Sequence, residues 1–184
     1  MLERATNLFL DANIFFAAVA SSKGGSYLII ELAKKGLLLV SSSAHALSEA
    51  EHNILKKLGS EALACHRANL LDMRLHMQSI SRAGEYVTGM SLQYLPDKDV
   101  PILIAAMESG ATHLITLDRK HFLDNQNIKD VLAEYMKIVT PGDFLKEYFA
   151  DKRNTDKRSQ RTSDVRKAGQ IIVNISCPDA YHVR

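Results

Sequence analysis

Four acidic side chains far apart along the chain are the residues whose chemistry stands out. They are Asp11, Glu49, Asp99 and Asp118. At an effective dielectric near 20, two carboxylates about 4 Å apart repel each other by roughly 4 kcal/mol, so a cluster of acids needs a proton or a cation. Carboxylate oxygens favour Mg²⁺ or Mn²⁺, and such an ion can activate water and stabilise a phosphodiester during cleavage. If the four acids meet in space, the sequence therefore predicts a metal-dependent phosphodiester hydrolase.

Short apolar runs alternate with helical patterns, and these are the elements that would position the acids. Continuous apolar runs predict buried strands at residues 8–10, 37–40, 113–117 and 137–139. Helical periodicity predicts helices at residues 14–19, 27–35, 44–58, 60–79, 102–109 and 141–149. The serines at 41–43 are expected to cap the helix that follows them, and residues 86–95 are expected to form a short strand and a loop. This alternation predicts an α/β fold, a Rossmann-like three-layer sandwich with a parallel central sheet flanked by helices.

Such a fold would bring the four acids to one edge of the sheet. Asp11 and Asp118 end predicted strands, whereas Glu49 and Asp99 lie near the starts of helices. The crevice at the carboxyl ends of the strands is the usual functional site of an open α/β sheet. Each acid alone also has a structural interpretation, because Asp11 and Asp99 can cap helices and Asp118 can stabilise a turn. Only the complete set favours a metal site.

The order and spacing of four segments resemble the PIN-domain nucleases. The segments are LFLDANIFFAA (8–18), LSEAEHNILKKLG (47–59), LPDKDVPILIAAMESGATHLITLDRKHF (95–122) and IVTPGDFL (138–145). The resemblance covers about residues 7–150, and its third segment is the most specific. It implies a parallel sheet flanked by helices, metal-dependent ribonuclease activity and an active site with four acids.

The resemblance also implies a role for particular residues. Asp11, Glu49, Asp99 and Asp118 correspond to the catalytic acids, with Asp11, Asp99 and Asp118 as metal ligands and with Asn13, Thr116 and Asp97 in support. Asp99 matches the third acid better than Asp97 does, because it directly precedes the helix. Glu51 is the alternative to Glu49. Two residues on a helix point about 200° apart, so only one of them can face the site.

Other side chains near Asp118 have two interpretations. Arg119 and Lys120 could contact a substrate phosphate, or they could be a solvated pair. His113 and His121 flank Asp118 in sequence, and they are expected to be a strand residue and a surface residue.

The composition indicates a globular protein with a basic carboxyl-terminal extension. The chain has 184 residues and a formal charge of +2. From Asp151 onward eight Lys or Arg face four acids, which gives this segment +4 and leaves −2 for residues 1–150. We therefore expect a nuclease-like domain at 1–150 and a basic extension at 151–184, where residues 171–175 resemble an added strand. That extension could bind phosphates or remain a flexible tail.

No apolar run approaches the roughly 20 residues needed to cross a bilayer, and Cys65 and Cys177 show neither disulfide nor metal-ligand spacing. A cytoplasmic location without membrane contact is therefore expected. The expected partners of the protein are RNA and a further copy of the chain in a homo-oligomer. If the chain is the toxin of a toxin-antitoxin pair, an antitoxin protein is a third partner.

The function that these observations favour is a metal-dependent endoribonuclease that uses Mg²⁺ or Mn²⁺. Two alternatives stay open. One is a noncatalytic RNA- or protein-binding module of the same fold, in which the acidic pocket is an electrostatic feature. The other is a phosphatase of the haloacid dehalogenase kind, which is less favoured because Asn13 stands where that family has a second Asp.

Overall fold

The structure is a computed structural model that describes residues 6–80 and 94–153. Within these residues five strands form one parallel sheet in the order β3-β2-β1-β4-β5. The strands are β1 (Asn7–Leu10), β2 (Leu39–Ser43), β3 (Leu75–Gln78), β4 (His113–Ile115) and β5 (Lys137–Val139). The predicted parallel sheet is therefore confirmed.

Helices connect the strands, as a parallel sheet requires. They are α1 (Ala12–Ala20), α2 (Gly25–Lys34), α3 (Ala44–Leu58), α4 (Ser60–Asp72), α6 (Val100–Glu108) and α7 (Gln126–Leu132), with a short π-helical turn η3 (Arg119–Leu123). Residues 141–153 are also helical. Gly36 and Gly110, just beyond α2 and α6, have φ values of +68° and +64°, a backbone conformation that glycine adopts without strain.

The second strand differs from the prediction in its position. Residues 37–40 were expected to form it, but β2 spans Leu39–Ser43 and includes the serines that were predicted as caps. Ser43 does cap α3, because its side chain accepts a hydrogen bond from the Ala46 N–H. Ser41 and Ser42 are instead buried in the strand, where their hydroxyls donate to the Leu8 and Leu10 carbonyls of β1. Because both hydroxyls form hydrogen bonds inside the sheet, these polar residues do not end the strand.

The predicted long helix at 60–79 was wrong beyond Asp72. Helix α4 ends at Asp72, and β3 pairs in parallel with β2, from Val40 with Leu75 to Ser43 with Gln78. The sequence of β3, LHMQ, contains no β-branched residue, so local preference does not indicate a strand. This segment is a strand because it pairs with β2.

Two further differences concern the segment after β4. The strand ends at Ile115, two residues earlier than predicted, which places Thr116, Leu117 and Asp118 in the loop. Turn η3 and helix α7 were not predicted; Asn125 caps α7, and Ile128 and Leu132 are its buried face. The predicted strand at 86–95 falls mostly outside the described residues, and the one at 171–175 falls wholly outside.

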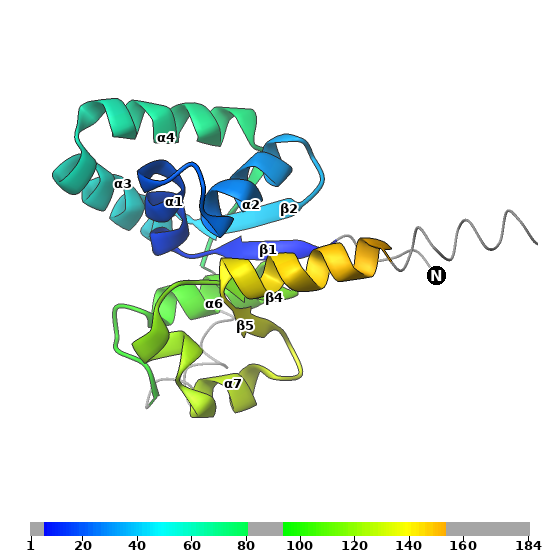
Figure 1. Ribbon diagram of the computed structural model, residues 1–184. Coiled ribbons are helices and arrows are strands. Elements are labelled where there is room, and N and C mark those ends of the chain that lie inside the picture. Colours follow the sequence, from blue (N-terminus) through cyan, green and yellow to red (C-terminus); the bar gives the residue numbers. More distant parts are fainter. Residues whose placement is uncertain (1–5, 81–93, 154–184) are drawn as a thin grey trace, which may run out of the picture. The chain divides into compact units, whose positions relative to one another are not determined.

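Both faces of the sheet are buried. Phe9 belongs to a core cluster with residues of α6, η3, α7 and β5. Leu8 and Leu10, which point to the opposite face of β1, are also fully buried. Figure 1 shows α1, α2, α3 and α4 gathered at one side of the sheet, and α6 and α7 at the other. This is the three-layer α/β sandwich that the sequence predicts.

The strand order determines where a site can form. The chain runs from β1 outward to β2 and β3, and it then returns to the other side of β1 to form β4 and β5. This reversal makes a topological switch point between β1 and β4, where the loops leaving the strands separate and open a crevice at the carboxyl ends. Asp11 follows β1, and Thr116 to Asp118 follow β4.

The chain divides into two units, Met1–Leu145 and Lys146–Arg184. In the second unit residues 146–153 are described and helical; Tyr148 contacts Phe149 edge to face, and the Lys152 ammonium lies 5.0 Å from the Tyr148 ring centroid. The basic extension at 151–184 stays a prediction, because residues 154–184 lie outside the described residues. Among the residues that are described, no helix combines the length and the apolar character needed to cross a membrane.

Candidate active site

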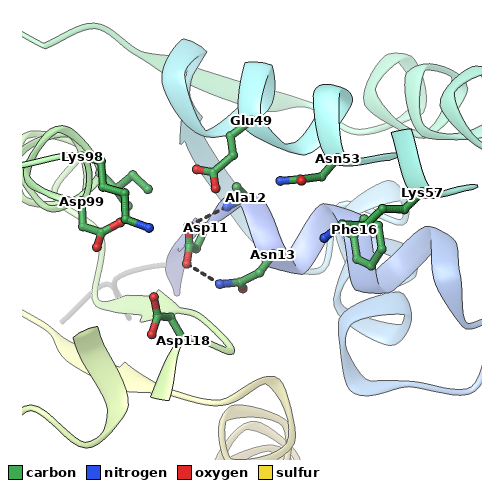
Figure 2. A pocket seen from close by; sticks show the side chains of 11 residues that line it. Asp11, Ala12, Asn13, Phe16, Glu49, Asn53, Lys57, Lys98, Asp99 and Asp118 are labelled. Carbon is green, nitrogen blue, oxygen red and sulfur yellow. Dashed lines mark hydrogen bonds between the residues drawn. The ribbon is translucent and has the colours of Figure 1, made fainter. Parts of the chain in front are cut away.

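A pocket of about 140 Å³ lies at the switch point between β1 and β4. The four predicted acids all line it, together with Lys98 before α6 and with side chains of three helices. The lining residues are Asp11, Glu49, Asp99, Asp118 and Lys98, with Ala12, Asn13 and Phe16 of α1, Asn53 and Lys57 of α3, and Ile102 of α6. Figure 2 shows the four carboxyl groups turned toward a common space. They come from segments separated by up to 107 residues, so only the tertiary structure brings them together.

Asp11 is fixed at the end of β1 by three hydrogen bonds. One carboxylate oxygen accepts from the Ala12 N–H at 2.7 Å and so caps α1, as the structural interpretation of this residue expected. The other oxygen accepts from the Asn13 amide and from the Thr116 hydroxyl, both at 2.6 Å. With 4% of its surface exposed, Asp11 is buried. Helix capping and a place in the pocket are therefore combined in one side chain.

Thr116 and Asn13 connect the β1 side of the pocket to the loop after β4. The Thr116 hydroxyl accepts from the Asn13 amide at 3.1 Å and from the Asp118 N–H at 3.0 Å. The Asn13 side-chain carbonyl accepts from the Leu117 N–H at 2.9 Å. These bonds set the course of the loop from Thr116 to Asp118, and they thereby fix the position of Asp118 relative to Asp11.

His121 joins Asp118 and Asp99. Its ring Nδ1 lies 2.8 Å from Asp118 Oδ2 and 3.1 Å from Asp99 Oδ2, and its backbone N–H donates to Asp118 Oδ1 at 3.0 Å. The single proton at Nδ1 can serve only one of the two carboxylates, and the shorter contact is with Asp118. The π-helical turn η3 places His121 there, three residues after Asp118.

The environment of each acid shifts its pKa. Burial raises the pKa of Asp11 to about 6, and the Glu49 charge adds to this rise, although the hydrogen bonds from Thr116, Ala12 and Asn13 oppose it. Burial also raises the pKa of Asp99; Asp118 and Glu49 add to that rise, while Lys98 and His121 oppose it. Both shifts favour protons or cations at these carboxyl groups.

Asp118 has the opposite shift. Burial acts to raise its pKa, but the hydrogen bonds from the backbone and ring of His121, with the His121 and Lys98 charges, hold the pKa below its ordinary value. Asp118 is therefore ionised when Asp11 and Asp99 still favour their protonated forms. One pocket therefore holds carboxyl groups with different proton affinities.

Comparisons with known proteins match the fold to solved structures. A chain of the VapBC2 complex from Rickettsia felis, solved with a DNA fragment from its promoter, has 19% identity and a TM-score of 0.53, over 73% of this chain and 98% of that one. A chain of DNA-bound VapBC from Salmonella typhimurium has 15% identity and a TM-score of 0.53 over the same shares. PAE2754 from Pyrobaculum aerophilum has 15% identity and a TM-score of 0.51, over 79% and 96%.

The fold is PIN-like. The fold that the sequence resemblance implies is thereby confirmed. No protein-family model matches the chain, and no curated protein matches it. At these identities the solved structures establish the fold alone.

Asp99 is the acid whose surroundings best fit a cation. Its Oδ2 is buried and, among the described residues, accepts no hydrogen bond, although His121 lies 3.1 Å away. In contrast to Asp11, Asp99 makes no side-chain capping bond to the helix that it precedes. Asp99, Asp118 and His121 each offer a ligand atom, and these atoms lie within 4.8 Å of one another. Carboxylate oxygens with an unsatisfied buried atom suit a hard divalent cation, so the residues fit Mg²⁺ or Mn²⁺.

Several predicted residues lie away from the pocket. Asp97 is exposed and does not line it. Glu51 points elsewhere on α3 and pairs with Arg67 at 2.7 Å. Arg119 is exposed and pairs with Asp124 at 3.2 Å, and Lys120 is also exposed. Neither lines the pocket. Glu49 rather than Glu51 is the α3 acid that faces the site.

Other pocket residues were missed by the sequence interpretation. His121 was expected to be a surface residue, but its side chain is 19% exposed and contacts two of the acids, so that expectation was wrong. The spacing of three between Asp118 and His121 could have indicated this contact if a helical turn had been expected there. Lys98, which lines the pocket, was also missed, and its only signal was its place next to Asp99 in sequence. Phe16, Asn53 and Lys57 carried no signal beyond helical periodicity.

Proposed function

We propose that this chain is a metal-dependent endoribonuclease that cleaves RNA phosphodiester bonds in the pocket at the switch point. The observation that carries the proposal is the meeting of four carboxyl groups from four segments in one pocket. One buried oxygen of Asp99 there accepts no hydrogen bond from any residue that the structure describes. Uncompensated carboxylates destabilise a fold, and a site that retains four of them is best explained by cation binding.

Each residue has a part in this proposal. Asp11, Asp99 and Asp118 hold Mg²⁺ or Mn²⁺, and His121 either orients Asp118 or completes the ligand set. A bound divalent ion supplies charge stabilisation for the phosphate and lowers the pKa of an attacking water. Glu49, which also lines the pocket, would accept a proton from the attacking water. Lys98 contacts a phosphate oxygen of the substrate.

Thr116 and Asn13 act as positioning residues. They hold the Asp11 carboxylate in one orientation and fix the loop that carries Asp118. Because Thr116 lowers the pKa of Asp11, it also keeps Asp11 available to a cation at neutral pH.

The biological role that we propose is that of the toxin in a toxin-antitoxin pair, with an antitoxin protein as partner. It rests on the fold shared with chains of the VapBC complexes. A homo-oligomer and a cytoplasmic location stay predictions from the sequence. The phosphatase alternative has no support in the pocket, since Asn13 donates its amide to Asp11 and cannot act as a general acid.

The decisive experiment compares RNA cleavage by the full chain and two Asp-to-Asn variants. Wild type is incubated with a labelled single-stranded RNA and Mn²⁺ or Mg²⁺, with EDTA as the metal-free reference. Asp118→Asn should lose about 100-fold or more of the rate, whereas Asp124→Asn, an exposed residue of the same loop region, should stay within about twofold. Metal-dependent cleavage by Asp118→Asn at the wild-type rate would overturn the assignment of the reaction to this pocket. Absence of cleavage by wild type with either metal would overturn the ribonuclease function and favour a noncatalytic binding module.

A further inference from the structure

The pocket extends beyond the acids along α1 and α3. Phe16 of α1 and Asn53 and Lys57 of α3 line it on the side away from Asp99 and Asp118 (Figure 2). Phe16 is the aromatic residue of the lining and is half-buried, and Lys57 is exposed. The pocket thus has a second part whose chemistry differs from that of the acidic part.

Helix geometry keeps this second part next to the acids. Glu49, Asn53 and Lys57 are spaced by four residues, so they follow one face of α3. At 1.5 Å per residue, Lys57 lies about 12 Å along the helix from Glu49. This distance lets a substrate reach the acids with one phosphate while a flanking nucleotide contacts Asn53 and Lys57.

The three side chains have the properties that recognise an unstacked base. The Lys57 ammonium lies over the Phe16 ring, 5.3 Å from its centroid. Because Lys57 is exposed, its side chain can move from the ring face to a phosphate when a base stacks there. Aromatic faces stack on bases of single-stranded RNA, and lysine neutralises its phosphates. Among the described residues the side-chain amide of Asn53 makes no hydrogen bond. Its N–H donors and its carbonyl acceptor are therefore available to a base edge.

We propose that Phe16, Asn53 and Lys57 form a subsite that binds one unstacked nucleotide of single-stranded RNA next to the cleaved bond. Phe16 stacks on the base, Asn53 binds its polar edge and sets a base preference, and Lys57 contacts the adjoining phosphate. This subsite rests on the proposed ribonuclease function, which supplies the substrate. It also predicts that paired RNA is a poor substrate, because its bases are not free to stack on Phe16.

The test is a double-mutant cycle between the protein and the RNA. A series of single-stranded RNAs carries one abasic site, moved along the chain position by position, and kcat/KM is measured with wild type and Phe16→Leu. Stacking on one aromatic side chain corresponds to about tenfold in binding. One abasic position should therefore cost wild type about tenfold, Phe16→Leu should lose the same on intact RNA, and the two changes together should lose no more than either alone.

Further variants separate the three roles from a general loss of folding. Phe16→Tyr keeps an aromatic ring and should therefore retain the wild-type rate. Asn53→Asp should change which base is preferred at the sensitive position. Lys57→Gln should raise KM several-fold with little change in kcat, whereas Lys56→Gln, its neighbour outside the pocket, should stay within about twofold.

Failure of the subsite and failure of the ribonuclease function give different results. If wild type cleaves RNA but the losses from Phe16→Leu and from every abasic site multiply, the subsite is overturned and the function stands. If wild type cleaves none of the RNAs, the function fails, and the same cycle is measured by fluorescence anisotropy of the labelled RNAs. Coupling of about tenfold in binding then supports the subsite, and its absence overturns it.

Discussion

The two sides of the pocket differ in how their side chains are held. On the side of β1 and β4, Asp11, Asp99 and Asp118 are buried or half-buried, and hydrogen bonds or a histidine contact fix them. On the side of α3, Glu49 and Lys57 are exposed and follow one another at helical spacing. Burial shifts the proton affinity of the carboxyl groups on the first side. The exposed side chains on the second side can change conformation when a substrate binds. The first side therefore suits cation chemistry and the second suits contact with a variable substrate.

The largest expected effect tests the buried side through Asp11. Its pKa of about 6 lies above the ordinary 3.8, so the folded state binds this proton more tightly than the unfolded state does. That contribution to stability is complete below pH 4 and is lost as the pH rises through 6. Without metal, wild type should therefore lose up to about 3 kcal/mol of its free energy of unfolding, relative to Asp11→Asn, as the pH is raised from 4 to 8.

Chemical denaturation in EDTA at several pH values measures this difference. The same variant should lose RNA cleavage, since a neutral amide is a poor ligand for Mg²⁺ or Mn²⁺. A stability difference between the two proteins that does not vary with pH would show that the Asp11 charge is not destabilising.

The next effect compares two glutamates on α3. Glu49→Gln should reduce kcat by about 100-fold if Glu49 accepts a proton during the reaction. Glu51→Gln loses an exposed ion pair with Arg67, which is worth at most about 1 kcal/mol of stability, and it should leave kcat within twofold. Single-turnover cleavage measures both. Equal rates for the two variants would remove Glu49 from the reaction and leave the chemistry to the buried side.

A smaller effect concerns the bond that holds Asp11 in place. Thr116→Val removes a hydroxyl that lowers the pKa of Asp11, so that pKa should rise further and the acid limb of the pH-rate profile should move to higher pH. For a pKa rise of about one unit, the rate at pH 6 should fall about fivefold. Thr112→Val, which loses a hydrogen bond to the Asn7 carbonyl outside the pocket, is the matched control and should leave the profile unchanged.

The smallest expected effects distinguish two cations. Lys98 lines the pocket, whereas Arg119 is paired with Asp124 at 3.2 Å on the surface. Lys98→Gln should raise KM about threefold to tenfold and make it less dependent on salt. Arg119→Gln should change KM less than twofold, and a larger change would show that substrate reaches the exposed side of η3.

Secondary structure near the acids followed from local patterns. The strand before Asp11 and the helix 44–58 could be predicted because continuous apolar runs and helical periodicity are properties of short segments. Strand β3 could not, since LHMQ becomes a strand only through its parallel pairing with β2. Ser41 and Ser42 were assigned to caps because their hydroxyl partners, the carbonyls of β1, lie more than 30 residues away in sequence.

By itself the sequence determined which acids follow strands and which lie next to or within helices, because an apolar strand followed by an acid is a local feature. Only the tertiary structure decided that Glu49 rather than Glu51 faces the pocket, that His121 joins Asp99 and Asp118, and that Phe16, Asn53 and Lys57 extend it. These outcomes depend on the direction of side chains and on burial between distant segments, and they arise only when β4 returns to the side of β1.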